Sequence, residues 1–67
     1  MNKFFTVVIQ KEDNWFVAKC LENSVASQGN TLDEAAENLR EALALYYEDE
    51  VLPIFPQTFV TTLEVAI

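Results

Sequence analysis

A chain of 67 residues forms one domain, and a core of that size is marginal unless a disulfide, a metal or a second chain supports it. The single cysteine excludes an intrachain disulfide, and the absence of histidine removes the commonest general base and metal ligand. The apolar content of 51% therefore predicts self-association, as a dimer or a higher oligomer.

The formal net charge is −7, and Arg40 is the only basic residue after Lys19. Such a field repels phosphate backbones, so we expect no direct nucleic-acid binding, and it attracts basic proteins. The same composition is also explained if the acidic residues only keep an apolar chain soluble. The first apolar run, FFTVVI, is too short for a membrane span or a secretion signal, which predicts a cytoplasmic protein without membrane contact.

The first half of the chain predicts three strands. Residues 3–10 alternate in the manner of a β-strand, KEDN follows as a tight turn, and WFVAKCL forms the second strand of a hairpin. VASQ is a short third antiparallel strand that ends at Gly29, where we expect a positive φ angle.

A helix follows, with Thr31 as its N-cap and Glu34 completing a capping box. We expect the helix to end near Tyr47, before the acidic Glu48, Asp49 and Glu50. Its apolar positions predict one stripe of core residues: Leu32, Ala35, Ala36, Leu39, Ala42, Leu43 and Tyr46.

The connector LPIFPQ contains both prolines and cannot continue the helix. The last segment, TFVTTLEVAI, alternates again and predicts a fourth strand with one apolar side, formed by Phe59, Thr61, Leu63, Val65 and Ile67.

The order β-β-β-α-β predicts an α+β fold, with a four-stranded mixed sheet in the order 3-2-1-4 and one helix on one face. The pattern alone leaves open which sheet face the helix covers. The uncovered face would carry some of Phe4, Val8, Trp15 and Val17, and this face predicts a partner surface. Leu45 falls outside the apolar stripe and is a second candidate contact, although a singly exposed leucine needs no explanation.

No catalytic chemistry is indicated. One glycine cannot form a phosphate-binding loop, Ser24 and Ser27 have no histidine to activate them, and Cys20 inside a strand is typical of a buried, inert thiol. A magnesium-dependent phosphoesterase needs clustered acids, but the first strand carries none. We therefore expect a non-enzyme without cofactor or metal.

Two blocks of the sequence resemble the HicB family of antitoxins. The first is a strand with Trp15, Val17 and Ala18, and the second is a turn and helix with Ser27, Gln28, Gly29, Thr31, Glu34, Ala35, Asn38, Leu39, Glu41 and Ala42. The resemblance covers about two thirds of the chain. It implies a partial ribonuclease-H-like fold that binds HicA, a small basic toxin that cleaves messenger RNA, and masks its active surface.

Two features depart from that family. This chain has CLENS where many members carry a proline-containing turn, and it ends at Ile67 where many continue into a DNA-binding segment, so we expect no transcriptional repression by this chain alone. The leading hypothesis is an antitoxin-like protein-binding module whose contacts come from Phe4, Val8, Trp15, Val17, Leu45, Glu48, Asp49 and Glu50. The alternative is an orphan structural or regulatory domain that associates with itself or senses a small ligand through its sheet.

Overall fold

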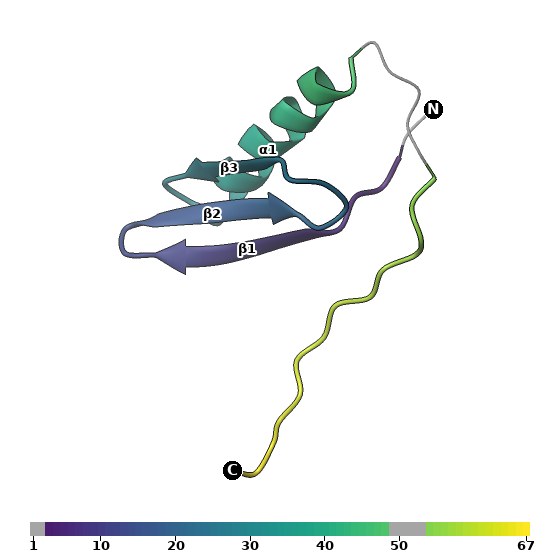
Figure 1. Ribbon diagram of the computed structural model, residues 1–67. Helices are drawn as coiled ribbons and strands as arrows, with labels where there is room; N and C mark the ends of the chain where they lie inside the picture. The colour runs from purple at the N-terminus through teal and green to yellow at the C-terminus, as the bar shows by residue number, and fades with distance from the viewer. Residues whose placement is uncertain (1–2, 49–53) are drawn as a thin grey trace.

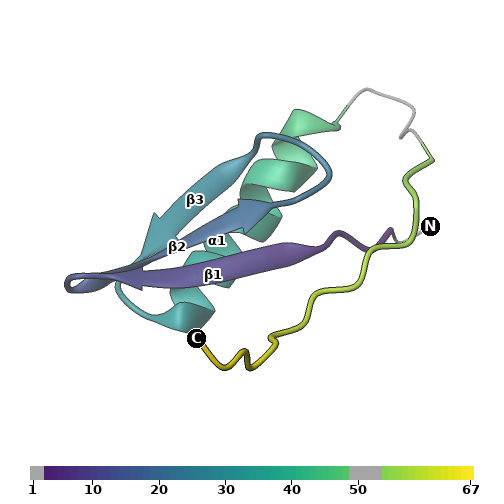
Figure 2. The same cartoon turned by 60° about the horizontal axis from the view of Figure 1, so that its bottom comes forward.

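The computed structural model describes residues 3–48 and 54–67 (Figure 1). Three strands, β1 (Val7–Glu12), β2 (Trp15–Cys20) and β3 (Ala26–Gly29), precede one helix, α1 (Leu32–Tyr46). The strands form an antiparallel sheet in the order β1-β2-β3, and α1 lies on one face of it (Figures 1 and 2). The α+β class, the hairpin, the third strand and the single covering helix are confirmed.

The first strand lies closer to the hairpin turn than predicted, since β1 begins at Val7 rather than at Lys3 and continues two residues past Gln10. Glu12 pairs with Trp15, so Lys11 and Glu12 belong to the strand, and Asp13 and Asn14 alone form the turn. Asp13 adopts a φ of 53°, in the left-handed region that aspartate tolerates better than most residues. This two-residue turn sets the register of the sheet.

The register also decides which face the helix covers. Ile9 lies opposite Ala18, and Val7 lies opposite Cys20, so these side chains share one face. α1 packs on that face, where Phe5, Ile9 and Phe16 surround a buried core that consists of Ala18, Cys20, Ala35, Leu39 and Leu43.

The start of the helix has the predicted cap. The Thr31 hydroxyl accepts a hydrogen bond from the Glu34 backbone N–H at 3.0 Å, while a Glu34 carboxylate oxygen accepts one from the Asn30 N–H at 3.1 Å. The carboxylate therefore reaches one residue further back than in the usual capping box.

The predicted core stripe is wrong at both ends of the helix. Leu32 is 51% exposed and Tyr46 is 57% exposed. A helix of 15 residues is about 22 Å long, whereas strands of 4 to 6 residues extend about 13–20 Å, so the sheet does not cover the stripe over its whole length. Tyr47, one residue past α1, packs against the core instead.

The expected positive φ at Gly29 is also wrong, because no described glycine has one. A Cβ placed on Gly29 would lie 2.6 Å from the backbone nitrogen of Ala35 and 2.8 Å from the carbonyl carbon of Glu34. Glycine is required here because the first turn of α1 lies against the end of β3.

Residues 54–67 contain neither helix nor strand in this structure, so the structure does not show the predicted fourth strand. The segment leaves the α/β unit in an extended line (Figure 1). In the part of the chain that the structure describes, the sheet has three strands and β1 lies at an edge.

Candidate functional site

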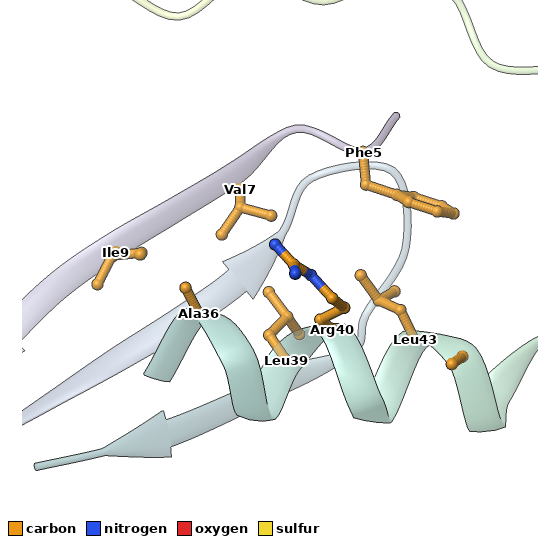
Figure 3. Close-up of a pocket in the computed structure, with 8 residues that line it drawn as sticks. Phe5, Val7, Ile9, Ala36, Leu39, Arg40 and Leu43 are labelled. Atoms are coloured by element: carbon orange, nitrogen blue, oxygen red, sulfur yellow. The ribbon is translucent and has the colours of Figure 1, made fainter. Parts of the chain in front are cut away.

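The helix leaves a groove beside β1. α1 packs chiefly on β3 and β2, and less closely on β1. The groove between β1 and α1 has a volume of about 440 Å³. Figure 3 shows Val7 and Ile9 pointing from β1 toward the helix and Arg40 reaching from α1 toward β1. The residues that line the groove are Phe5, Val7, Ile9, Ala36, Leu39, Arg40, Leu43 and Ala44.

The groove is almost wholly apolar, with one charge at its rim. Arg40 lies 3.3 Å from the Glu37 carboxylate, and both side chains are largely exposed to solvent. An ion pair of this kind contributes little to stability. The groove is therefore suited to apolar side chains from another segment.

β1 has a free hydrogen-bonding edge next to this groove, which we call the open edge. Within the described ranges, β2 pairs with one side of β1 and no strand pairs with the other. The opposite sheet edge is different, because β3 has only 4 residues and the Asn38 side-chain amide donates to the Gln28 carbonyl at 2.8 Å. Unpaired strand edges accept further strands, and β1 is the better acceptor.

Aromatic contacts place the start of segment 54–67 at the beginning of β1. The Phe5 ring stacks on Tyr47 and meets Phe55 at a tilt, with 5.7 Å between ring centroids in each pair. From Phe55 onward, the segment runs in the same general direction as β1 without pairing with it (Figures 1 and 2).

Beyond Gln57 the segment exposes apolar side chains. Phe59, Leu63, Val65 and Ile67 are all largely exposed, and they occupy alternate positions along the chain with Thr61 among them. Full burial of one such apolar side chain contributes about 1.5–3 kcal/mol. Each of these side chains lacks this stabilisation while the segment remains unpaired.

The sheet face opposite α1, which we call the outer face, mixes apolar and polar residues. Val8, Trp15 and Val17 lie on it, Trp15 exposed and the two valines half-buried. Val8 is paired with Lys19, and Val17 is paired with Gln10. The outer face is therefore an amphipathic surface rather than a bare apolar one.

The exposed side of α1 carries a row of acids. Asp33, Glu37 and Glu41 follow one another at intervals of four residues, and Leu45 takes the next place in the row. Leu45 is 70% exposed, and Glu48 lies beyond it, also exposed. We call these five residues the acidic row.

Glu22 closes the β1–β2 ladder beyond the last strand pair. A carboxylate oxygen of Glu22 accepts hydrogen bonds from the Thr6 backbone N–H at 2.8 Å and from the Cys20 thiol at 3.4 Å. Burial works to raise the pKa of Glu22, but the hydrogen bonds from Thr6 and Cys20 outweigh it, so this pKa lies below its ordinary value. Burial raises the pKa of Cys20, which keeps this thiol protonated.

The described ranges contain no helix with the length and apolar character needed to cross a membrane. Among residues 3–48 and 54–67, no three side chains of His, Cys, Asp or Glu lie together in a way that could hold a metal ion.

The predicted contact residues fall on two opposite sides of the domain. Val8, Trp15 and Val17 share the outer face, whereas Leu45 belongs to α1, which covers the other face, and Glu48 lies two residues past the end of α1. Phe4 is exposed just before β1. Asp49 and Glu50 lie outside the described residues.

Sequence reasoning missed the groove. Its helical side is a row at intervals of four, Ala36, Arg40 and Ala44, and this row was detectable as a second face of α1 beside the core stripe. The side of the groove formed by β1 was not detectable, because both alternating sets of residues in 3–10 contain apolar side chains and either set could face the helix.

Together these elements define a small α+β domain with a three-stranded antiparallel sheet and one covering helix. The chain belongs to a family of unknown function, DUF7387, which it matches over residues 5–62. No curated protein and no solved structure matches the chain.

Proposed function

We propose that the chain is a non-catalytic protein-binding module, similar to the HicB antitoxins, that binds a small basic HicA-type ribonuclease toxin and masks its RNA-binding surface. The acidic row on α1 is the observation that carries this proposal. The row lies on the exposed side of the helix that contains six of the thirteen HicB-like residues.

The acidic row is costly for an isolated helix. Like charges four residues apart, such as Asp33 and Glu37 or Glu37 and Glu41, each destabilise a helix by about 0.2–0.5 kcal/mol. Arg40 pairs with Glu37, but the last turn of α1 has no basic residue that could offset the remaining acids. A basic partner removes this repulsion on binding, and the net charge of −7 speeds its approach.

Leu45 supplies an apolar contact inside the charged surface. It is exposed in the row, next to Glu41 and Glu48 in the pattern of the helix. Binding energy concentrates in apolar anchors that become desolvated, while the surrounding charges set orientation and association rate. On the other side of the domain, Trp15 on the outer face is the candidate for a second anchor.

The proposal also includes a fourth strand, which the HicB-like fold requires. Residues 58–67 form a fourth strand parallel to β1, which completes the sheet order 3-2-1-4 and the partial ribonuclease-H-like fold. The contact of Phe55 with Phe5 supports this, since it starts the segment at the beginning of β1. The apolar groove supports it too, because an added strand beside β1 would fill it.

Binding to a HicA-type toxin tests the function. The Glu41→Gln/Glu48→Gln variant changes the net charge from −7 to −5, and so does the control Glu12→Gln/Asp13→Asn at the hairpin turn. We expect the helix variant to weaken binding at low salt by about tenfold and the hairpin variant to have a much smaller effect. Leu45→Ala should weaken binding at both low and high salt.

The proposed function is wrong if the wild-type chain neither binds the toxin at low salt nor relieves its toxicity on co-expression. Equal losses of affinity in the two charge variants would show that the acidic row is not part of the interface and that only the net charge affects binding.

A second candidate function, a domain that associates with itself and has no toxin partner, is favoured by the exposed apolar positions of residues 58–67. A monomer in sedimentation equilibrium would contradict it, and a dimer that also fails to bind the toxin would support it.

A further inference from the structure

The open edge of β1 and segment 58–67 are complementary. The edge offers unpaired backbone groups beside a groove lined by apolar side chains from β1 and α1. The segment offers an extended backbone (Figure 1) and has apolar side chains at alternate positions, as a strand that buries one side requires. Leu63, near its middle, is 83% exposed.

In this structure the segment does not pair with the open edge of its own chain. Phe55 is held against Phe5, and Pro56 restricts Phe55 to extended backbone conformations, which favours a straight continuation of the chain. The result is an elongated molecule, with a longest extent of 46 Å and a radius of gyration of 13.7 Å. A compact chain of this length has a radius of gyration of about 11 Å.

We propose that two copies of this chain exchange segments 58–67, so that each segment pairs in parallel with the open edge of the other copy and buries its apolar side in that copy's groove. This inference rests on the fourth strand proposed above and specifies whose edge it occupies.

Two further observations favour a second copy as the occupant. Among the described residues, each chain buries only five apolar side chains, two of which are alanines, so one chain has a small core of its own. Reciprocal exchange gives a closed two-fold dimer, in which both edges and both segments are used and no strand is left free to propagate. The edge of β3 is a poorer site for the segment, because the Asn38 side-chain amide already donates a hydrogen bond to the Gln28 carbonyl there.

The test combines sedimentation equilibrium with isotope-filtered nuclear Overhauser measurements on the full chain. Labelled and unlabelled chains are unfolded, mixed and refolded together. We expect a dimer with contacts between the Leu63 or Val65 methyl groups of one chain and the Val7 or Ile9 methyl groups of the other.

A matched pair of variants tests the orientation of the segment. Leu63→Glu places a charge on the side that enters the groove and should weaken dimerisation by about 100-fold or more. Thr62→Glu adds the same charge one residue away, on the opposite side of the strand, and should change the dimer dissociation constant by less than about threefold.

Three results would overturn the exchange. A monomer whose methyl contacts all lie within one chain would mean that the fourth strand forms, but on the β1 edge of the same chain. A chain without contacts between residues 58–67 and β1 would refute the fourth strand as well. A dimer that tolerates Leu63→Glu as well as Thr62→Glu would use another surface. Toxin binding enters none of these measurements, so the proposed function stands or falls separately.

Discussion

A Cβ on Gly29 would lie 2.6 Å from the backbone nitrogen of Ala35, closer than any real contact of this type. The end of β3 and the first turn of α1 therefore touch through their backbones. Since Ala35 is itself fully buried, neither side can move away without opening the core.

Gly29→Ala should consequently destabilise the fold by about 2 kcal/mol or more, because backbone atoms rather than a flexible side chain must move. Ala26→Val, on an exposed position of the same strand, should change stability by less than about 0.5 kcal/mol. Urea unfolding followed by circular dichroism measures both. A glycine whose only role is chain flexibility would instead give a gain of about 0.4–1 kcal/mol on replacement by alanine, and that result would refute the close contact.

Two leucines of α1 have opposite environments. Leu39 is 1% exposed, at the centre of the core, whereas Leu45 lies in the acidic row. Leu39→Ala should cost about 2–5 kcal/mol, since it leaves a cavity between helix and sheet. Leu45→Ala should cost less than about 1 kcal/mol. Thermal unfolding of both variants provides the comparison, and a large loss for Leu45→Ala would mean that this side chain supports the fold and is not free to bind a partner.

Two adjacent tyrosines should also differ. The Tyr47 hydroxyl accepts a hydrogen bond from the Asn23 side-chain amide at 2.9 Å and its ring stacks on Phe5, which joins the end of α1 to the β2–β3 loop and to β1. Tyr47→Phe keeps the ring and should cost about 1 kcal/mol through the lost hydrogen bond. Tyr46→Phe, at an exposed position, should be close to neutral. Equal unfolding midpoints for the two variants would contradict this role of the Asn23 bond.

Glu22 predicts a specific acid sensitivity. Its pKa in the folded protein lies below the ordinary value of 4.5, so the ionised carboxylate stabilises the fold at any pH above 4.5. This contribution is lost as pH falls from 4.5 through the lower folded-state pKa, because the carboxylate that accepts from Thr6 becomes protonated.

The measurement compares the unfolding free energies of the wild type and Glu22→Gln from neutral to acidic pH. The advantage of the wild type should be constant above pH 4.5 and shrink below it. A difference between the two proteins that does not change with pH would show that Glu22 is not held ionised by Thr6 and Cys20.

The elements of the fold that depend on neighbours in the chain could be predicted from the sequence. The Thr31 cap bonds a backbone group three residues away, and the hairpin turn involves only Asp13 and Asn14, so short patterns contain the whole interaction. The hydrophobic period likewise predicted three strands and one helix, because periods of two and of 3.6 residues reflect local backbone geometry.

Tertiary structure alone decided how these elements meet. Both sides of the first strand carry apolar residues, so only packing with α1 could place Val7 and Ile9 inside and Val8 outside. The need for glycine at position 29 comes from Ala35, which belongs to another element. The contact of Tyr47, rather than Tyr46, with the core depends on Phe5 and Asn23, which lie far from it in the sequence. For residues 58–67, the alternation of apolar residues predicted a strand with one apolar side. A strand forms only where another strand supplies its backbone hydrogen bonds. A local sequence pattern does not indicate which strand that is.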